Sequence, residues 1–153
     1  MKKIRISVIG GHAPSDECYE LAYQFGKKAA EKDWQIICGG LGGVMEAVSK
    51  GVSEAGGEVI GILPSEDFHS GNQYLTFSVA TGLGWMRNAL VVMNGDVVVA
   101  IDGSYGTLSE ISYAKIMNKK VFSLSSWDID GVKKVKDLEE LIREIEDFLN
   151  AQL

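Results

Sequence analysis

DVVVAIDGSYGTLSE, residues Asp96 to Glu110, joins an apolar run, a glycine-containing bend and the start of a helical pattern. The run from Asp96 to Ile101 is almost entirely apolar and rich in valine, which is typical of a strand buried on both faces of a sheet. The segment from Thr107 to Asn118 has helical periodicity, and glycines separate the two elements. A strand–glycine–helix unit of this kind predicts a parallel sheet whose strands are connected by helices.

The same alternation of strands and helices extends from this unit in both directions. The predicted strands are Ile4–Ile9, Trp34–Cys38, Glu58–Leu63, Leu75–Val79, Asp96–Ile101 and Lys120–Leu124, with Val132–Val135 as a candidate seventh. The predicted helices are Asp16–Lys32, Val44–Ala55, Gly84–Asn94, Thr107–Asn118 and Asp137–Leu149. We therefore expect an α/β fold, a single Rossmann-like domain over residues 1–153. Its three layers should be doubly wound around a mainly parallel sheet of six or seven strands.

Composition narrows the classes of function. The 153 residues carry a formal charge of −6, and no run of adjacent Lys or Arg exceeds two residues, which argues against a nucleic-acid partner. No apolar run approaches the ~18 residues that span a bilayer. Cys18 and Cys38 lie within predicted elements, which favours free thiols in a reducing compartment over a disulfide. These features predict a cytoplasmic protein with no membrane partner. Because His12 and His69 are isolated, we also expect no metal, and we expect no cofactor.

Glycines are concentrated where predicted strands end. The chain has 18 glycines, against the roughly eleven that an average composition gives, and 2 prolines. The surplus forms three groups: Gly10-Gly11, Gly39-Gly40 with Gly42-Gly43, and Gly103 with Gly106. In a parallel sheet these bends share the carboxyl edge of the strands, where ligands bind in such folds. The second group precedes a predicted helix N-terminus, and its exposed amides favour an anionic ligand.

The segment Ile101–Glu110 supports two interpretations. Thr107-x-x-Glu110 is a capping box, in which the Glu side chain would return to the backbone at the start of the helix. Gly103, Ser104 and Gly106 ahead of the same helix also form an anion-binding nest, with a carboxylate one turn behind it. The spacing of the residues leaves both interpretations open.

Three motifs in this order, GGLGGVMEAV, GWMRN and DGSYGTLSE, resemble the Lonely Guy (LOG) family of nucleoside 5′-monophosphate phosphoribohydrolases. They also resemble relatives known as possible lysine decarboxylases, and the molybdenum cofactor carrier proteins. The likeness runs from about Ile4 to Leu124. The family's Gly-Gly-x-Gly-Thr-x-x-Glu overlays Gly103–Glu110, and its Arg, one helix and one strand earlier, falls on Arg87.

The resemblance implies hydrolysis of the N-glycosidic bond of a nucleoside monophosphate, or carriage of a phosphorylated nucleotide or pterin-like ligand without catalysis. It makes Arg87 and Glu110 the catalytic pair. It also assigns phosphate binding to Gly103, Ser104, Gly106 and Thr107. The further ligand-binding candidates are Gly10, Gly11, Gly39, Gly40, Gly42, Gly43, Met45, Glu46 and Asn88. Relatives are dimers, so the resemblance also implies a homodimer or a higher homo-oligomer.

Two departures place the chain nearer the short carrier branch. The phosphate loop carries Asp102 and Ser104 where many relatives have Pro or Gly, and Gly84-Trp85-Met86 precedes Arg87. A carboxylate at Asp102 would repel a phosphate if it pointed inward. Lysine decarboxylase activity has no support, because pyridoxal chemistry needs a buried Schiff-base lysine and the lysines here have the pattern of surface residues.

Overall fold

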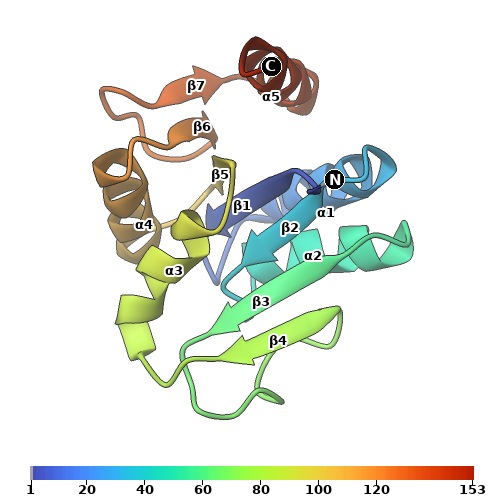
Figure 1. The fold of residues 1–153 in the computed structure, drawn as a ribbon, viewed down its shortest axis with the longest axis vertical. Coiled ribbons are helices and arrows are strands. Elements are labelled where there is room, and N and C mark those ends of the chain that lie inside the picture. Colours follow the sequence, from blue (N-terminus) through green and yellow to red (C-terminus); the bar gives the residue numbers. More distant parts are fainter. Residues whose placement is uncertain (1) are drawn as a thin grey trace.

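The computed structural model describes residues 2–153, and its strands form a sheet in which every strand runs parallel to its neighbours (Figure 1). The strands are β1 (Arg5–Gly10), β2 (Gln35–Cys38), β3 (Val59–Leu63), β4 (Phe77–Ala80), β5 (Val97–Ile101), β6 (Lys120–Leu124) and β7 (Lys133–Val135). The helices are α1 (Asp16–Glu31), α2 (Val44–Glu54), α3 (Arg87–Met93), α4 (Tyr105–Ile116) and α5 (Leu138–Ala151), with a 3-10 turn η1 (Gly84–Met86). The predicted Rossmann-like α/β class and the seventh strand are confirmed.

The strand order, β4-β3-β2-β1-β5-β6-β7, defines where a ligand can enter the fold. The chain builds outward from β1 to β4, then returns to place β5 against the other side of β1 and builds outward again. The direction therefore reverses between β1 and β5, and in folds of this kind ligands bind at such a switch point, outside the carboxyl ends of the strands. All three glycine groups follow strands at or beside this switch point: β1, β2 and β5.

Two apolar cores lie on opposite faces of the sheet. One joins α1, α2 and α5 to the sheet through fully buried residues such as Phe25, Val48 and Leu141. The other lies beneath α3 and α4, around Val91 and Ile111. Figure 1 shows α3 and α4 together on one side of the sheet, away from α1 and α2. This arrangement gives the three predicted layers.

Most element bounds shift by one or two residues from the sequence prediction, and three of the differences are instructive. The fourth strand starts at Phe77 instead of Leu75, because Leu75 turns inward to contact Gly61 and Gly71. The predicted helix over Gly84–Asn94 is divided into η1 and α3, and Gly84, the first residue of η1, has a φ of +58°, outside the α-helical range. Helix α4 begins at Tyr105, two residues before its predicted start.

The predicted free thiols are confirmed: Cys18 and Cys38 are both buried and unbridged. Within residues 2–153, no helix combines the length and the apolar character that crossing a bilayer demands.

Candidate functional site

The glycine bends after β1, β2 and β5 meet at the carboxyl edge of the sheet. A Cβ built on Gly11 would lie 3.2 Å from the Cα of Gly103, and one on Gly43 would collide with the Gly11 carbonyl. The Val44 N–H also donates to that carbonyl over 2.9 Å. Gly43 and Gly103 have φ values of +68° and +111°, a region that side chains with a Cβ rarely adopt. The bends therefore approach closely because their residues lack side chains.

The start of α4 decides between the two interpretations of Ile101–Glu110. The N-cap is Ser104, which makes no side-chain cap hydrogen bond, and Glu110 lies in the second turn. The capping box is therefore not formed. Among the described residues, nothing accepts a hydrogen bond from the backbone amides of Tyr105, Gly106 or Thr107, as expected for the first turn of a helix. These amides face the helix N-terminus, an arrangement that suits an anion.

Asp102 is tied to the backbone around it. Its Oδ1 accepts from the Gly103 N–H over 2.8 Å, and its Oδ2 accepts from the Ser15 N–H over 3.2 Å. Its φ of +55° turns the chain sharply at the end of β5. The carboxylate therefore connects the loop after β5 to the start of α1 and occupies the Gly103 amide, one of the groups that the resemblance assigns to phosphate.

Arg87 lies folded against the second glycine bend. A Cβ on Gly39 would collide with the Arg87 Nη1 and with the Met45 sulfur, so the guanidinium needs a glycine at this point. The side chain is only 7% exposed, and Nη1 donates to Asn88 Oδ1 over 2.9 Å. The Arg87 Nε is buried without a hydrogen-bond partner. A buried N–H that bonds to nothing is costly, and a ligand oxygen would relieve that cost.

Glu110 is 6% exposed and accepts no hydrogen bond from any residue between 2 and 153. Burial raises the pKa of Glu110 to about 8, and the positive charge of Arg87 offsets part of that rise. Burial also lowers the pKa of Arg87, an effect that the nearby Glu110 opposes. The two groups do not form an ion pair within 4 Å. A buried carboxyl group close to a buried guanidinium, without an ion pair between them, is frequent in functional sites.

A short hydrogen-bond chain links Arg87 to the phosphate loop. Asn88 Nδ2 donates to Ser109 Oγ over 3.2 Å, and Ser109 Oγ donates to the Gly106 carbonyl over 2.6 Å. Asn88, predicted as a ligand-binding residue, is 3% exposed. Its Oδ1 accepts from Arg87 Nη1, which helps to orient the guanidinium. Ser109 was missing from the predicted site, although its position three residues after Gly106 is the spacing of a helical side chain that bonds back to a carbonyl.

Asn72 is a second residue that the sequence did not identify. Its N–H donates to the Gly40 carbonyl over 2.8 Å, and its Nδ2 donates to the Leu41 carbonyl over 3.0 Å. Its Oδ1 accepts from the Tyr74 N–H, which forms an Asx turn. The loop between β3 and β4 therefore braces the second glycine bend through the backbone N–H and the side chain of one residue.

The remaining predicted residues differ in what surrounds them. Met45 contacts Gly39 beside Arg87, and Gly42 has open space where a Cβ would be. The Glu46 carboxylate accepts from the Tyr19 hydroxyl over 3.3 Å and so joins α2 to α1. Gly10 is packed against Val44 and the Ile101 carbonyl, which explains its glycine without any ligand. Among the described residues, no cluster of three His, Cys, Asp or Glu side chains has the arrangement of a metal site.

A comparison of the sequence with models of protein families identifies the family to which the chain belongs. Residues 3–148 match the model of the SLOG cluster4 family, and the chain belongs to that family. The resemblance inferred from the three motifs is thereby confirmed.

Two solved structures are similar to the chain over nearly its whole length. The chain is similar to a molybdenum cofactor binding protein from the phototrophic bacterium Rippkaea orientalis, with 33% identity, a TM-score of 0.92 and coverage of 97% of this chain and 99% of that one. It is also similar to the molybdenum cofactor carrier protein of Chlamydomonas reinhardtii, with 28% identity, a TM-score of 0.90 and coverage of 97% and 99%.

One plant relative is named as a probable phosphoribohydrolase. A probable cytokinin riboside 5′-monophosphate phosphoribohydrolase of rice, Oryza sativa, is 30% identical over 112 residues, which cover 70% of this chain and 46% of the plant protein. The chain therefore spans about half the length of that relative.

Proposed function

We propose that this protein binds a phosphorylated nucleotide at the carboxyl edge of the sheet and hydrolyses its N-glycosidic bond, releasing the base and a ribose 5-phosphate. The observation that carries the proposal is the pair formed by Arg87 and Glu110. Both residues are more than nine-tenths buried, and the Arg87 Nε is a buried donor without a hydrogen-bond partner among residues 2–153. Such a donor destabilises the empty protein, and an oxygen of a bound ligand would satisfy it.

The phosphate half of the ligand fits the first turn of α4. The amides of Tyr105, Gly106 and Thr107 supply donors there, and the Thr107 side chain points into the same bend, where it contacts Gly103. The helix dipole adds favourable potential for a dianion. Because the protein as a whole is negatively charged, the positive potential at the N-terminus of α4 is what attracts the anionic ligand.

The chemistry assigned to Glu110 and Arg87 follows from the charges that develop during cleavage. The bond from the anomeric carbon to the base nitrogen breaks, its electron pair leaves with the base, and an oxocarbenium ion forms on the ribose. The Glu110 carboxylate stabilises that cation and accepts a proton from the attacking water, whose oxygen bonds to the anomeric carbon, and the departing base nitrogen takes up the proton in turn. With a pKa of about 8 in the empty protein, Glu110 is mostly protonated at neutral pH, so its action as a base requires the ionised form, whose share grows as the pH rises toward 8. Arg87 offsets negative charge on the phosphate or on the departing base.

Aromatic side chains around the phosphate loop suit a planar base or pterin ring. Trp85 and Tyr105 are 79% and 80% exposed, and a Cβ on Gly106 would lie 3.4 Å from the Trp85 ring. Trp127 Nε1 donates to the Ser104 carbonyl over 3.0 Å, which holds a third ring beside the loop. Exposed rings next to a phosphate site provide a surface on which a heteroaromatic ring can stack.

The test is an assay for free base. Purified protein is incubated with AMP, GMP, CMP and UMP, and released base is measured by chromatography. We expect release from at least one monophosphate, and a loss of at least about 100-fold in Glu110→Gln, since removing one group that acts in the transition state has effects of that size. Glu110→Gln should still bind ribose 5-phosphate by calorimetry. Release that is unchanged in this variant would overturn the proposed role of Glu110.

A carrier function without catalysis is the second candidate, and a specific observation favours it. The chain matches two molybdenum cofactor proteins over nearly the whole length of both partners, whereas it covers less than half of the plant hydrolase. If the wild-type protein binds nucleotides or pterin phosphates tightly but releases no base from any monophosphate, the carrier function replaces the enzyme.

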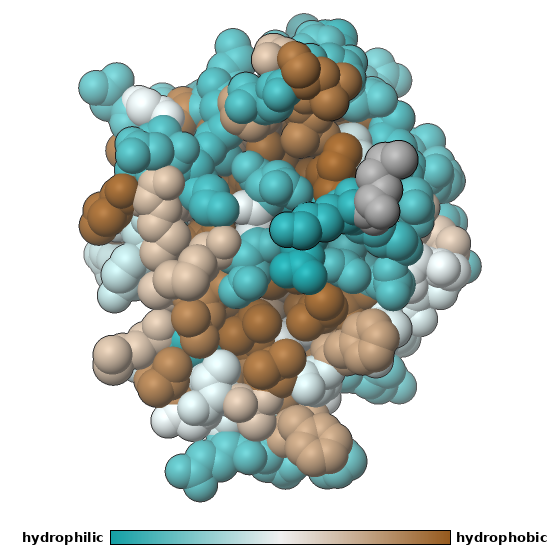
Figure 2. Space-filling view, viewed as in Figure 1, coloured by the Kyte–Doolittle hydropathy of each residue, from teal (hydrophilic) through white to brown (hydrophobic). Residues whose placement is uncertain are grey.

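We also propose that a second copy of this chain covers the apolar face beside α3. Phe77 and Val79 on β4 are about half exposed, and they pair in register with Ile60 and Ile62 on the α3 side of the sheet. Figure 2 shows apolar side chains gathered on this face, below the centre of the molecule. An apolar patch of this kind on a small protein is typical of an interface between subunits.

A further inference from the structure

The hydrogen-bond chain from Arg87 to the first turn of α4 allows only one direction of donation. A guanidinium has donors and no acceptor, so the amide oxygen of Asn88 must face Arg87, and it accepts from Nη1 over 2.9 Å. The amide nitrogen of Asn88 therefore faces Ser109 and donates to its Oγ over 3.2 Å. The Ser109 hydroxyl donates in turn to the Gly106 carbonyl over 2.6 Å. Because the two middle residues both accept and donate, replacing either of them interrupts the whole hydrogen-bond chain.

The far end of this hydrogen-bond chain is the peptide group between Gly106 and Thr107. The carbonyl that accepts from Ser109 belongs to the same planar unit as the Thr107 N–H, one of the amides proposed to hold the phosphate. Amides in the first turn have no helical acceptor, so the bonds made by the attached carbonyls hold them in place. A hydrogen bond to a carbonyl also polarises its peptide group, which makes the N–H a stronger donor. Ser109 can therefore act on a proposed phosphate-binding amide through the peptide plane.

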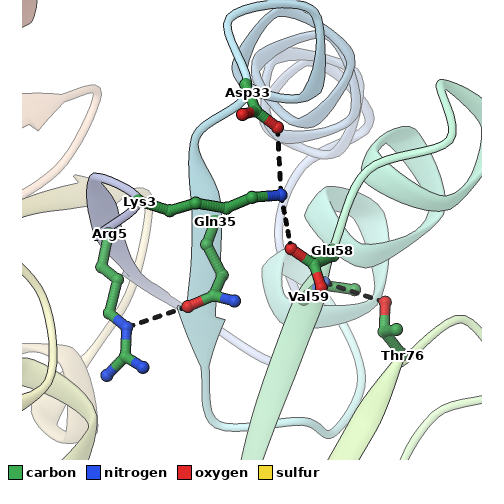
Figure 3. Close-up of polar contacts among 7 residues, drawn as sticks. All are labelled: Lys3, Arg5, Asp33, Gln35, Glu58, Val59 and Thr76. Atoms are coloured by element: carbon green, nitrogen blue, oxygen red, sulfur yellow. Dashed lines mark hydrogen bonds and ion pairs between the residues drawn. The ribbon is translucent and has the colours of Figure 1, made fainter. Parts of the chain in front are cut away.

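Most of this hydrogen-bond chain is withdrawn from water. Arg87 and Asn88 are 7% and 3% exposed, and Ser109 is half-buried. Figure 3 shows the contrasting case at the opposite edge of the sheet, where Lys3 Nζ lies 2.7 Å from Glu58 and both side chains are partly open to solvent. Water competes with an exposed pair of that kind, which therefore contributes little, whereas buried hydrogen bonds are stronger and restrict the groups that make them. The buried contacts can therefore fix the orientation of the groups at both ends.

Ser112, one turn later on α4, shows what a serine does in this helix without Asn88. Its Oγ donates to the Leu108 carbonyl over 3.0 Å, much as Ser109 donates to Gly106. Helical serines often bond to a carbonyl of the preceding turn, so this bond alone carries no argument for a ligand. Ser112 is exposed, and among the described residues no side chain donates to it. The bond from Asn88 is what distinguishes Ser109, and helix formation does not explain it.

We infer that Ser109 is a positioning residue for the proposed ligand site. Towards α3 it acts through Asn88 on the Arg87 guanidinium. Towards the phosphate loop it acts through the Gly106 carbonyl on the Thr107 amide. The guanidinium and the phosphate-binding amide are thereby held in one arrangement for two parts of the same ligand. The inference rests on the proposed phosphate site but not on hydrolysis, because a carrier needs the same arrangement.

The test compares two side chains of nearly equal volume at position 109. Ser109→Thr keeps a hydroxyl that can bond to a carbonyl three or four residues earlier in a helix, and Ser109→Val replaces that hydroxyl with a methyl group. Calorimetry should show ribose 5-phosphate binding about fivefold or more weaker in Ser109→Val than in Ser109→Thr, since the loss of one hydrogen bond has effects of this size. The control pair, Ser112→Thr and Ser112→Val, should bind ribose 5-phosphate equally.

Asn88→Ala distinguishes a connected hydrogen-bond chain from two independent contributions. It interrupts the same contacts, so adding it to Ser109→Val should weaken binding little beyond the larger of the two single effects. Urea unfolding of each variant checks that the fold is retained. Two losses that multiply would mean that the residues act independently, and this result would overturn the inference. Equal binding by Ser109→Thr and Ser109→Val would overturn it as well.

Failure of the proposed function gives a different result. If the wild-type protein binds ribose 5-phosphate but releases no base from any monophosphate, hydrolysis fails and the comparison at Ser109 still decides the inference. If the wild-type protein does not bind ribose 5-phosphate, the proposed phosphate site fails before any variant is made, and the role of Ser109 fails with it.

Discussion

Gly39 allows the Arg87 guanidinium to lie against the backbone of the second bend, because any Cβ there would collide with Arg87 Nη1. We expect Gly39→Ala to displace the guanidinium and weaken ribose 5-phosphate binding by about 10-fold or more. The cost in the free energy of unfolding should be about 1–3 kcal/mol, as for other added methyl groups in packed regions. Calorimetry and urea unfolding measure the two effects separately.

Gly42→Ala is the control for this substitution. Gly42 lies three residues away in the same bend, where a Cβ would meet no atom within 4 Å. We expect ligand binding and stability close to wild type. Equal losses in the two variants would mean that the flexibility of the bend, and not the position of Arg87, determines binding.

Glu110 should make stability depend on pH. Burial raises its pKa from 4.5 in the unfolded chain to about 8 in the folded protein, so the folded state keeps a proton that the unfolded state has lost. This contribution to the free energy of unfolding is complete below about pH 4.5 and is lost as the pH rises through about 8. The difference between wild type and Glu110→Gln should therefore fall by a few kcal/mol over this range.

Urea unfolding of both proteins, from about pH 5 to about pH 9, measures this difference. Every other titrating group is common to the two proteins, so their effects cancel to first order. A difference that stays constant or rises with pH would contradict the raised pKa of Glu110.

Among the elements, the turn from β5 into α4 combines the proposed phosphate-binding amides with a negative charge, that of Asp102. Asp102 holds this turn by accepting from the Gly103 N–H at Oδ1 and from the Ser15 N–H at Oδ2. Asn tolerates the same positive φ, but its amide nitrogen cannot accept, so it keeps one of the two bonds. We expect Asp102→Asn to hold the turn through the bond from Gly103 and to remove the negative charge, so ribose 5-phosphate should bind several-fold tighter at low salt. Calorimetry at two salt concentrations gives the measurement.

Asp33→Asn provides the comparison, because Asp33 has a similar φ of +58° and lies after α1, on the surface beside Lys3. Its substitution should leave ribose 5-phosphate binding unchanged. Weaker binding in Asp102→Asn would mean that the loop needs the charged carboxylate to keep its shape.

At the element scale the sequence predicted most of the structure, because hydrophobic periodicity and glycine placement are local signals. The apolar run of β5 and the glycines after β1 and β2 were enough to predict the parallel sheet and the edge that holds the site. The start of α4 was missed, since Thr107 and Glu110 have the pattern of a capping box and only burial beside Arg87 overrules it. Asn72 was missed because its partners, Gly40 and Leu41, lie some thirty residues earlier and meet it only in the folded sheet.

At the scale of the whole molecule, the sequence leaves open whether an apolar stripe packs against another subunit or in the core: Leu90, Val91 and Met93 beside Ile111, Ala114 and Met117. In the structure Val91, Ile111 and Ala114 are buried in the core. The exposed apolar side chains instead come from β4, η1 and the ends of α3 and α4: Phe77, Val79, Leu83, Trp85, Met86, Met93 and Ile116. Edge strand β4 contributes because no helix covers its Phe77 and Val79 side chains.

If a second copy covers this face, light scattering after size exclusion should give the mass of a dimer for the wild-type protein. Phe77→Lys/Val79→Lys should shift that mass to the monomer, since both side chains are exposed and the fold does not depend on them. Phe68→Lys is the control: it is 56% exposed, against 54% for Phe77, but it lies in the loop before β4 and stacks on His69. A wild-type monomer, or a dimer that persists in the double variant, would exclude this face as the interface.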